Sequence, residues 1–92
     1  MAEPDLHRRL QRQARALGDP TRYRIFRFVA DAADPVSVAE ITAHVDLHHN
    51  GVRQHLAKLC DAELLLEETV RAGPGRPSLH YRLGPAGSRF LA

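Results

Sequence analysis

The chain has 92 residues, which is enough for one small domain with a modest core. About 43% of the residues are apolar and 26% are charged, as in a soluble globular protein, and no apolar stretch approaches the roughly 20 residues of a membrane-spanning helix. The single cysteine, Cys60, excludes an intramolecular disulfide and a metal site of several cysteines. Because the first residues lack the pattern of a secretory signal, we expect a cytoplasmic protein with no membrane partner.

The charges are distributed unevenly, although the formal net charge is only +2. Most arginines gather in three segments, namely Arg8, Arg9, Arg12 and Arg15, then Arg22, Arg24 and Arg27, and finally Arg71, Arg76, Arg82 and Arg89. The acidic residues collect mostly between these segments and toward Glu63, Glu67 and Glu68. This asymmetry can produce a positive face, which slightly favours nucleic-acid binding.

The first half of the chain predicts three helices. Residues 5–17 carry apolar side chains at helical spacing, with arginines between them: Leu6, Leu10, Ala14 and Leu17. Asp19 is a good N-cap and Pro20 suits the first helical position, so a second helix is expected over 19–33, with Ile25, Phe26, Phe28 and Val29 buried. A capping box of Ser37 and Glu40 then predicts a helix over 37–46.

The second half predicts one more helix and a hairpin. After a short turn, Val52, Leu56 and Leu59 form the apolar stripe of a helix over 49–62. Two strands within 64–83 flank a loop rich in glycine and proline, and residues 84–92 form a tail without a helix stop, which indicates truncation. We therefore predict a single α+β domain over 1–92, mostly helical, with a winged helix-turn-helix architecture and a two-stranded hairpin wing.

The helix over 49–62 has side chains suited to reading DNA on the face away from its apolar stripe. Asn50, Arg53, Gln54, Ala57 and Lys58 point outward if Val52 points inward. Arginine pairs well with guanine, and asparagine or glutamine pairs well with adenine, in the major groove. Arg76 at the hairpin tip could reach a phosphate or the minor groove. The residues thus predict double-stranded DNA as the partner.

Three segments carry a resemblance to a known family. Residues 16–22 (ALGDPTR) look like the opening of ArsR-like winged-helix regulators, and residues 52–59 (VRQHLAKL) resemble their recognition helix. Residues 75–83 (GRPSLHYRL) are similar to the wing of the related SufR-like regulators. The resemblance covers roughly residues 14 to 87.

The resemblance implies a transcription regulator that binds an inverted-repeat operator as a homodimer. The base-contacting residues that it implies are His49, Asn50, Arg53 and Gln54, with Arg76 in the wing. Where these families have glycine after the recognition helix, this chain has Glu63, for which a left-handed conformation costs about 1 kcal/mol. We therefore expect that the helix ends differently and that the strand begins later than residue 64. The cysteines of SufR-like sensor domains are absent, so the chain either lacks a sensor or is a fragment.

Two alternatives stay open, and catalysis has little support. The domain could serve as a protein-interaction module without DNA, because the acidic Glu67 and Glu68 flank the wing. It could also sense a metal through His44, His48, His49 and His55. However, the turn over residues 46–48 breaks the face that His44 and His48 would share, and His49 and His55, six residues apart, do not share a face well. Because no nucleophile with a base and no phosphate loop is recognisable, we predict no enzyme activity and no cofactor. Cys60 is expected to be a small packing residue.

Overall fold

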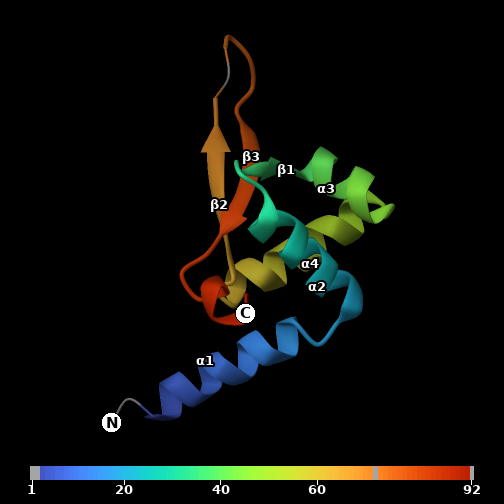
Figure 1. The fold of residues 1–92 in the computed structure, drawn as a ribbon. Helices are drawn as coiled ribbons and strands as arrows, with labels where there is room; N and C mark the ends of the chain where they lie inside the picture. Colours follow the sequence, from blue (N-terminus) through green and yellow to red (C-terminus); the bar gives the residue numbers. More distant parts are fainter. Residues whose placement is uncertain (1–2, 72, 92) are drawn as a thin grey trace.

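The computed structural model describes residues 3–71 and 73–91. Its elements follow in the order α1 (Glu3–Ala16), α2 (Pro20–Asp31), β1 (Val36–Ser37), α3 (Val38–Val45), α4 (His49–Asp61), β2 (Leu65–Val70), β3 (Ser78–Leu83) and a 3₁₀ helix (Gly87–Phe90). Helices α2, α3 and α4 cluster beside the base of the hairpin formed by β2 and β3 (Figure 1). The hairpin loop projects from one end of the molecule, and α1 extends from the other, as the longest dimension of 49 Å reflects.

The predicted α1 and α2 are present, and the predicted cap sets the start of α2. The Asp19 carboxylate accepts a hydrogen bond from the backbone N–H of Arg22 at 3.0 Å, which satisfies one free amide of the first turn. Helix α2 ends at Asp31, two residues before the predicted end. Of its predicted buried residues, Phe28 is only partly buried, and its ring stacks on that of the exposed His44 at a centroid distance of 4.1 Å.

Helices α3 and α4 form the helix-turn-helix unit. The capping box of α3 is confirmed: Ser37 Oγ accepts from the Glu40 N–H, and Glu40 Oε1 accepts from the Ser37 N–H, both at 3.1 Å. Asp46 ends α3 in the left-handed region, at φ 55°. The predicted stripe of α4 is fully buried, so the opposite side of this helix faces outward: Val52, Leu56 and Leu59.

The hairpin wing is confirmed, and a third strand joins it. Strands β2 and β3 pair antiparallel from Leu65 opposite Leu83 to Val70 opposite Ser78. The two-residue strand β1, which the sequence did not predict, pairs with β3 through Val36 opposite Tyr81. Because both of these side chains are buried, β1 ties the α2–α3 connection to the base of the wing.

The expectation that α4 ends differently because of Glu63 is wrong. Glu63 adopts the left-handed conformation at φ 64°, and the helix closes with a Schellman motif. The Leu64 N–H donates to Leu59 O, and the Glu63 N–H donates to Cys60 O, both at 3.0 Å. Burial of Leu64 and the ion pair of Glu63 with Arg9 at 2.8 Å stabilise this conformation despite its cost. As expected, the strand begins after residue 64, at Leu65.

The segment after β3 packs closely against the end of α4. Gly84 donates its N–H to Leu64 O at 2.8 Å, and Ala86 donates to Glu63 O at 2.9 Å. A side chain at Gly84 would have its Cβ only 2.6 Å from Glu63 O, so the close approach requires glycine. This contact anchors the turn between α4 and the wing.

A single hydrophobic core joins α2, α3, α4 and the sheet. Its fully buried members include Ile25, Phe26, Ile41, Leu56, Leu64 and Leu65. Within residues 3–71 and 73–91, none of the helices has the length and apolar character that a membrane crossing requires.

Candidate nucleic-acid interface

The first two turns of α4 present an exposed polar surface. His49, Asn50, Arg53 and Gln54 are all exposed there. In the part of the chain that the structure describes, none of these four side chains has a hydrogen-bond or ion-pair partner. His48 caps the helix, because its Nδ1 accepts from the Asn50 N–H at 3.2 Å. The start of α4 is therefore fixed, and the His49 ring packs on the His48 ring at a centroid distance of 4.1 Å. The outward side chains of Asn50, Arg53 and Gln54 can bind a ligand without breaking a hydrogen bond or ion pair among the described residues.

The outward side chains of α4 divide between two sides of the helix. Because Val52 and Leu56 face the core, Asn50 and Gln54 lie near the centre of the exposed face. Arg53 lies toward the wing, where it lines a groove of about 720 Å³ between α4, the start of α3 and β3. Lys58 lies on the other side, toward α1 and α2. The structure thus separates two cations that the sequence placed on one surface.

Carboxylates of the wing are engaged within the sheet. The Tyr81 hydroxyl donates to Glu67 Oε2 at 2.8 Å, and burial, followed by this bond, raises the pKa of Tyr81. Glu68 lies 3.7 Å from the Arg82 guanidinium. Since both acids have partners inside the wing, they offer little support for an acidic docking surface beside it.

Arg76 lies apart from α4, on the loop at the projecting end of the hairpin (Figure 1). Its side chain is exposed, and Gly73 in the same loop adopts φ 77°. The loop thus holds the Arg76 guanidinium away from α2, α3 and α4, so that it can contact a different part of a ligand than α4 contacts.

The histidines are dispersed among separate structural roles. His44 stacks on Phe28, His48 caps α4, and His55 Nδ1 accepts from Arg22 Nε at 3.2 Å. Burial is the main cause that lowers the pKa of His55, against the opposing charge of Asp19. Over residues 3–71 and 73–91, no three His, Cys, Asp or Glu side chains gather in a way that could hold a metal ion.

Cys60 is a partly buried packing residue at the end of α4. Burial, with smaller effects from the Glu67 and Asp61 charges, raises the pKa of its thiol to about 11. Because the thiolate is the reactive form, this side chain is poorly reactive near neutral pH.

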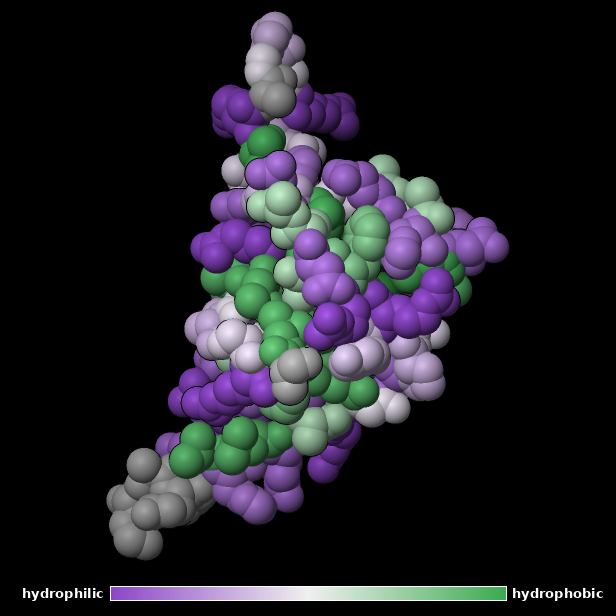
Figure 2. Space-filling view, viewed as in Figure 1, coloured by the Kyte–Doolittle hydropathy of each residue, from purple (hydrophilic) through white to green (hydrophobic). Residues whose placement is uncertain are grey.

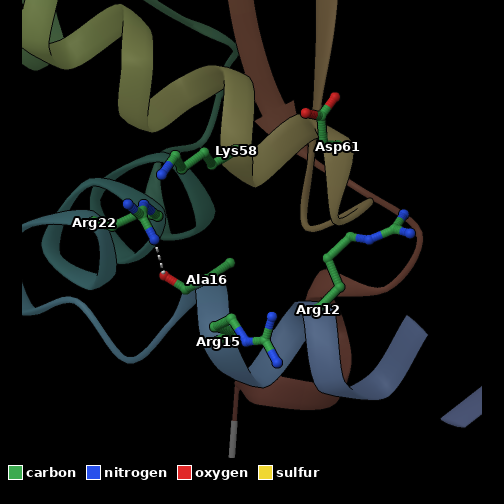
Figure 3. Close-up of a pocket in the computed structure, with 6 residues that line it drawn as sticks. All are labelled: Arg12, Arg15, Ala16, Arg22, Lys58 and Asp61. Atoms are coloured by element: carbon green, nitrogen blue, oxygen red, sulfur yellow. Dashed lines mark hydrogen bonds between the residues drawn. The ribbon is translucent and has the colours of Figure 1, made fainter. Parts of the chain in front are cut away.

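The sequence alone did not predict one cluster of cationic side chains. Arg12 and Arg15 of α1 and Arg22 of α2 line one pocket together with Lys58 of α4 (Figure 3). The arginine-rich segments were evident from the sequence, but their convergence depends on how α1 and α2 lie against the end of α4. Spacing along the chain gives no signal for that arrangement.

Comparisons with known proteins identify the same helix-turn-helix unit and the same fold. Residues 17–68, more than half of the chain, match the family described as a helix-turn-helix domain. No curated protein sequence matches the chain. In the structure, the chain is similar to reduced HlyU from Vibrio cholerae, with a TM-score of 0.74 and 20% identity over 99% of this chain and 90% of that one.

Two further solved structures share the fold. One is the homodimeric winged helix-turn-helix DNA-binding domain of Mb0332 from Mycobacterium bovis, a possible ArsR-family regulator, with a TM-score of 0.77, 21% identity, and 98% and 78% of the two chains covered. The other is Bacillus subtilis PadR in complex with operator DNA, with a TM-score of 0.64, 20% identity, and 76% and 43% covered. The chain therefore belongs to the helix-turn-helix domain family, and it has the winged helix fold of ArsR-like regulators.

Proposed function

We propose that this protein is a transcription regulator that binds duplex DNA sequence-specifically, with α4 in the major groove. The observation that carries the proposal is the capped start of α4, where Asn50, Arg53 and Gln54 are exposed and have no hydrogen-bond or ion-pair partner among the described residues. An α-helix fits the major groove, and these side-chain types pair with guanine and adenine edges there. The family match to a helix-turn-helix domain supports the same function.

The proposed contacts are of two kinds, to bases and to backbone phosphates. His49, Asn50, Arg53 and Gln54 would contact bases, because they occupy the outward part of the first two turns. Lys58 would contact a backbone phosphate from the edge of this surface, and Arg76 would do so from the wing. Phosphate contacts supply affinity without sequence information, whereas base contacts supply specificity.

A homodimer is the second part of the proposal, and α1 supports it. Among the α1 residues from Asp5 on, whose burial the structure describes, Gln13 and Ala16 are buried, whereas Leu6 and Leu10 are 44% and 40% exposed. Apolar surface is visible along α1 in Figure 2. Gln13 is 2% exposed, and its Oε1 has no hydrogen-bond partner among the described residues. A second copy packed on α1 would cover the leucines, and the solved M. bovis domain with this fold is homodimeric.

Selection from a randomised duplex pool, followed by sequencing of the bound DNA, tests the proposal. We expect an enriched inverted repeat whose half-site spacing reports the distance between two α4 helices. The double variant Asn50→Ala/Gln54→Ala should lose this enrichment, whereas Arg24→Ala, which changes an exposed arginine of α2, should keep it. Absence of enrichment together with salt-insensitive binding would contradict the proposal and favour a protein-interaction module.

A further inference from the structure

A basic pocket lies at the junction of α1, α2 and α4, away from the groove between α4 and the wing. It has a volume of about 370 Å³ and is lined by Arg12, Arg15, Ala16, Arg22, Lys58 and Asp61. Four of these six residues are cationic and one is acidic. Figure 3 shows the Lys58 side chain turned toward the Arg22 guanidinium, while the guanidinium groups of Arg12 and Arg15 project from α1 and point away from this pair.

Among the described residues, the four cations of this pocket form no ion pair. Arg22 is held by neutral acceptors, donating from one guanidinium nitrogen to Ala16 O and from Nε to His55 Nδ1, both at 3.2 Å. Over the described ranges 3–71 and 73–91, no carboxylate lies within ion-pair distance of Arg12, Arg15, Arg22 or Lys58. The Asp61 carboxylate points away from Lys58 and Arg22 in Figure 3. Four cations are therefore gathered around one lining carboxylate, Asp61, and none of them forms an ion pair among the described residues. An anion would stabilise this arrangement.

We propose that this pocket binds a small, multiply charged phosphate compound. Its volume lies in the range of small-molecule sites, which is roughly 300–1,000 Å³. Guanidinium groups hold phosphate oxygens in bidentate fashion, and an ammonium group adds a point charge. Because the described residues that line the pocket include no aromatic ring, recognition would depend on the phosphate groups and not on stacking with a base. Arg22 is already oriented by its two hydrogen bonds, whereas Arg12 and Arg15 are exposed and can turn inward.

Occupancy of this pocket would weaken DNA binding, a consequence that rests on the function proposed above. Lys58 lines the pocket and is also a proposed phosphate contact, so a bound anion would remove its charge from the DNA surface. The anion would also bridge α1, which carries the proposed dimer surface, to the end of α4. The pocket is thus placed to couple a small-molecule signal to the operator.

The first experiment needs no DNA and uses pyrophosphate as the probe. We expect pyrophosphate, titrated at constant ionic strength, to raise the melting temperature of the full chain by several degrees, because a ligand bound only by the folded state stabilises it. Lys58→Gln and Arg15→Gln should each weaken pyrophosphate about tenfold, as loss of a charged hydrogen bond does. Arg24→Gln removes an arginine outside the pocket and should bind like the wild type. The absence of a shift, or an equal shift in all variants, would overturn the proposal.

The second experiment separates this proposal from the DNA-binding function. We expect pyrophosphate to weaken operator binding severalfold more than chloride of equal ionic strength, and Lys58→Gln to abolish that difference. If pyrophosphate does not bind while Lys58→Gln and Arg15→Gln both lower DNA affinity, the pocket holds a DNA phosphate instead, and the proposal is overturned. If pyrophosphate binds through Lys58 and Arg15 but DNA does not bind, the pocket stands and the DNA-binding function fails.

Discussion

The two ends of α4 have opposite relations to the rest of the domain. At its start, His49, Asn50, Arg53 and Gln54 are exposed, the backbone is capped by His48, and the His49 ring packs on the His48 ring. At its end, the last carbonyls are satisfied by the Schellman bonds, and the residues on either side are buried or held by Gly84 and the following turn.

This contrast indicates that the two ends of α4 have different roles, one in stability and one in binding. The end of α4 holds the helix against the core and against the turn that leads to the wing, whereas its start carries the side chains proposed to contact bases. Lys58, in the last turn, is the proposed phosphate contact outside that start. Substitutions at the end should therefore change the free energy of unfolding, and substitutions at the start should change DNA binding.

The largest expected effect is on stability, at the end of α4. In Gly84→Ala, the new Cβ would lie 2.6 Å from Glu63 O and 2.9 Å from both Leu64 C and Leu65 N, so the turn must shift. We expect the free energy of unfolding to fall by about 3 kcal/mol, measured by urea denaturation. Gly75→Ala is the matched control, because a Cβ there meets nothing within 4 Å. A loss below about 1 kcal/mol would show that the turn adapts easily.

The next effect is on DNA reading, at the start of α4. Arg53→Ala should weaken binding to the selected operator by about 10- to 100-fold, because a bidentate contact to a base contributes roughly 1–3 kcal/mol of discrimination. Binding to random DNA should fall much less, and urea denaturation should be unchanged, since Arg53 is exposed. Fluorescence anisotropy with both duplexes measures this difference. Equal losses on the two duplexes would reassign Arg53 to phosphate binding.

A smaller effect of opposite sign is expected at Glu63. Glu63→Gly should stabilise the domain by up to about 1 kcal/mol, because glycine adopts the left-handed conformation at φ 64° without strain. Loss of the exposed ion pair with Arg9 will offset part of this gain. Arg9→Gln, which removes the ion pair alone, is the control for that part. A net loss of stability in Glu63→Gly would mean that the carboxylate contributes more than the strain costs.

The wing should contribute a modest and sequence-independent effect. Arg76→Ala should weaken operator and random DNA by a similar, severalfold factor, because the proposed contact is to a phosphate. The slope of log affinity against log salt should decrease by about 1, as expected for one lost phosphate contact. Unchanged affinity and slope would leave the hairpin tip without a role in binding.

Local sequence signals predicted most of the fold. The cap at Asp19 and the capping box of Ser37 and Glu40 depend on residues within four positions, so the starts of α2 and α3 were readable from the chain. Strand β1 was not predicted, because two residues carry no periodicity and their pairing with β3 joins distant segments. At Glu63, the local preference for glycine was overridden by the packing of the following turn.

The outward face of α4 was predictable for a similar reason. Helical spacing alone places Asn50 and Gln54 opposite Val52, and the structure confirms that both are exposed. Spacing could not show that Arg53 and Lys58 lie on different sides, next to the wing and next to α1 respectively. The basic pocket depends on three elements meeting in space, and so on tertiary packing that local patterns do not encode.

The smallest expected effect is on the pH dependence of the free energy of unfolding, at His55 in the middle of α4. His55 Nδ1 accepts from Arg22 Nε at 3.2 Å, which a doubly protonated ring cannot do. Burial, together with the Arg22 and Lys58 charges and against that of Asp19, lowers the pKa of His55 below 6.5. Just below pH 6.5 the unfolded chain therefore binds more protons at this position than the folded chain does.

The contribution of His55 to the free energy of unfolding is then complete above pH 6.5 and decreases as the pH falls toward the lower folded-state pKa. We expect His55→Gln to lose less stability than the wild type between pH 7.5 and pH 5.5 in urea denaturation, because the titrating ring is absent. His7→Gln, on the exposed surface of α1, is the matched control and should follow the wild type. A steeper pH dependence in His55→Gln would show that the protonated His55 ring stabilises the fold. The hydrogen bond that the neutral ring accepts from Arg22 would then not be the interaction that stabilises the packing of α2 on α4.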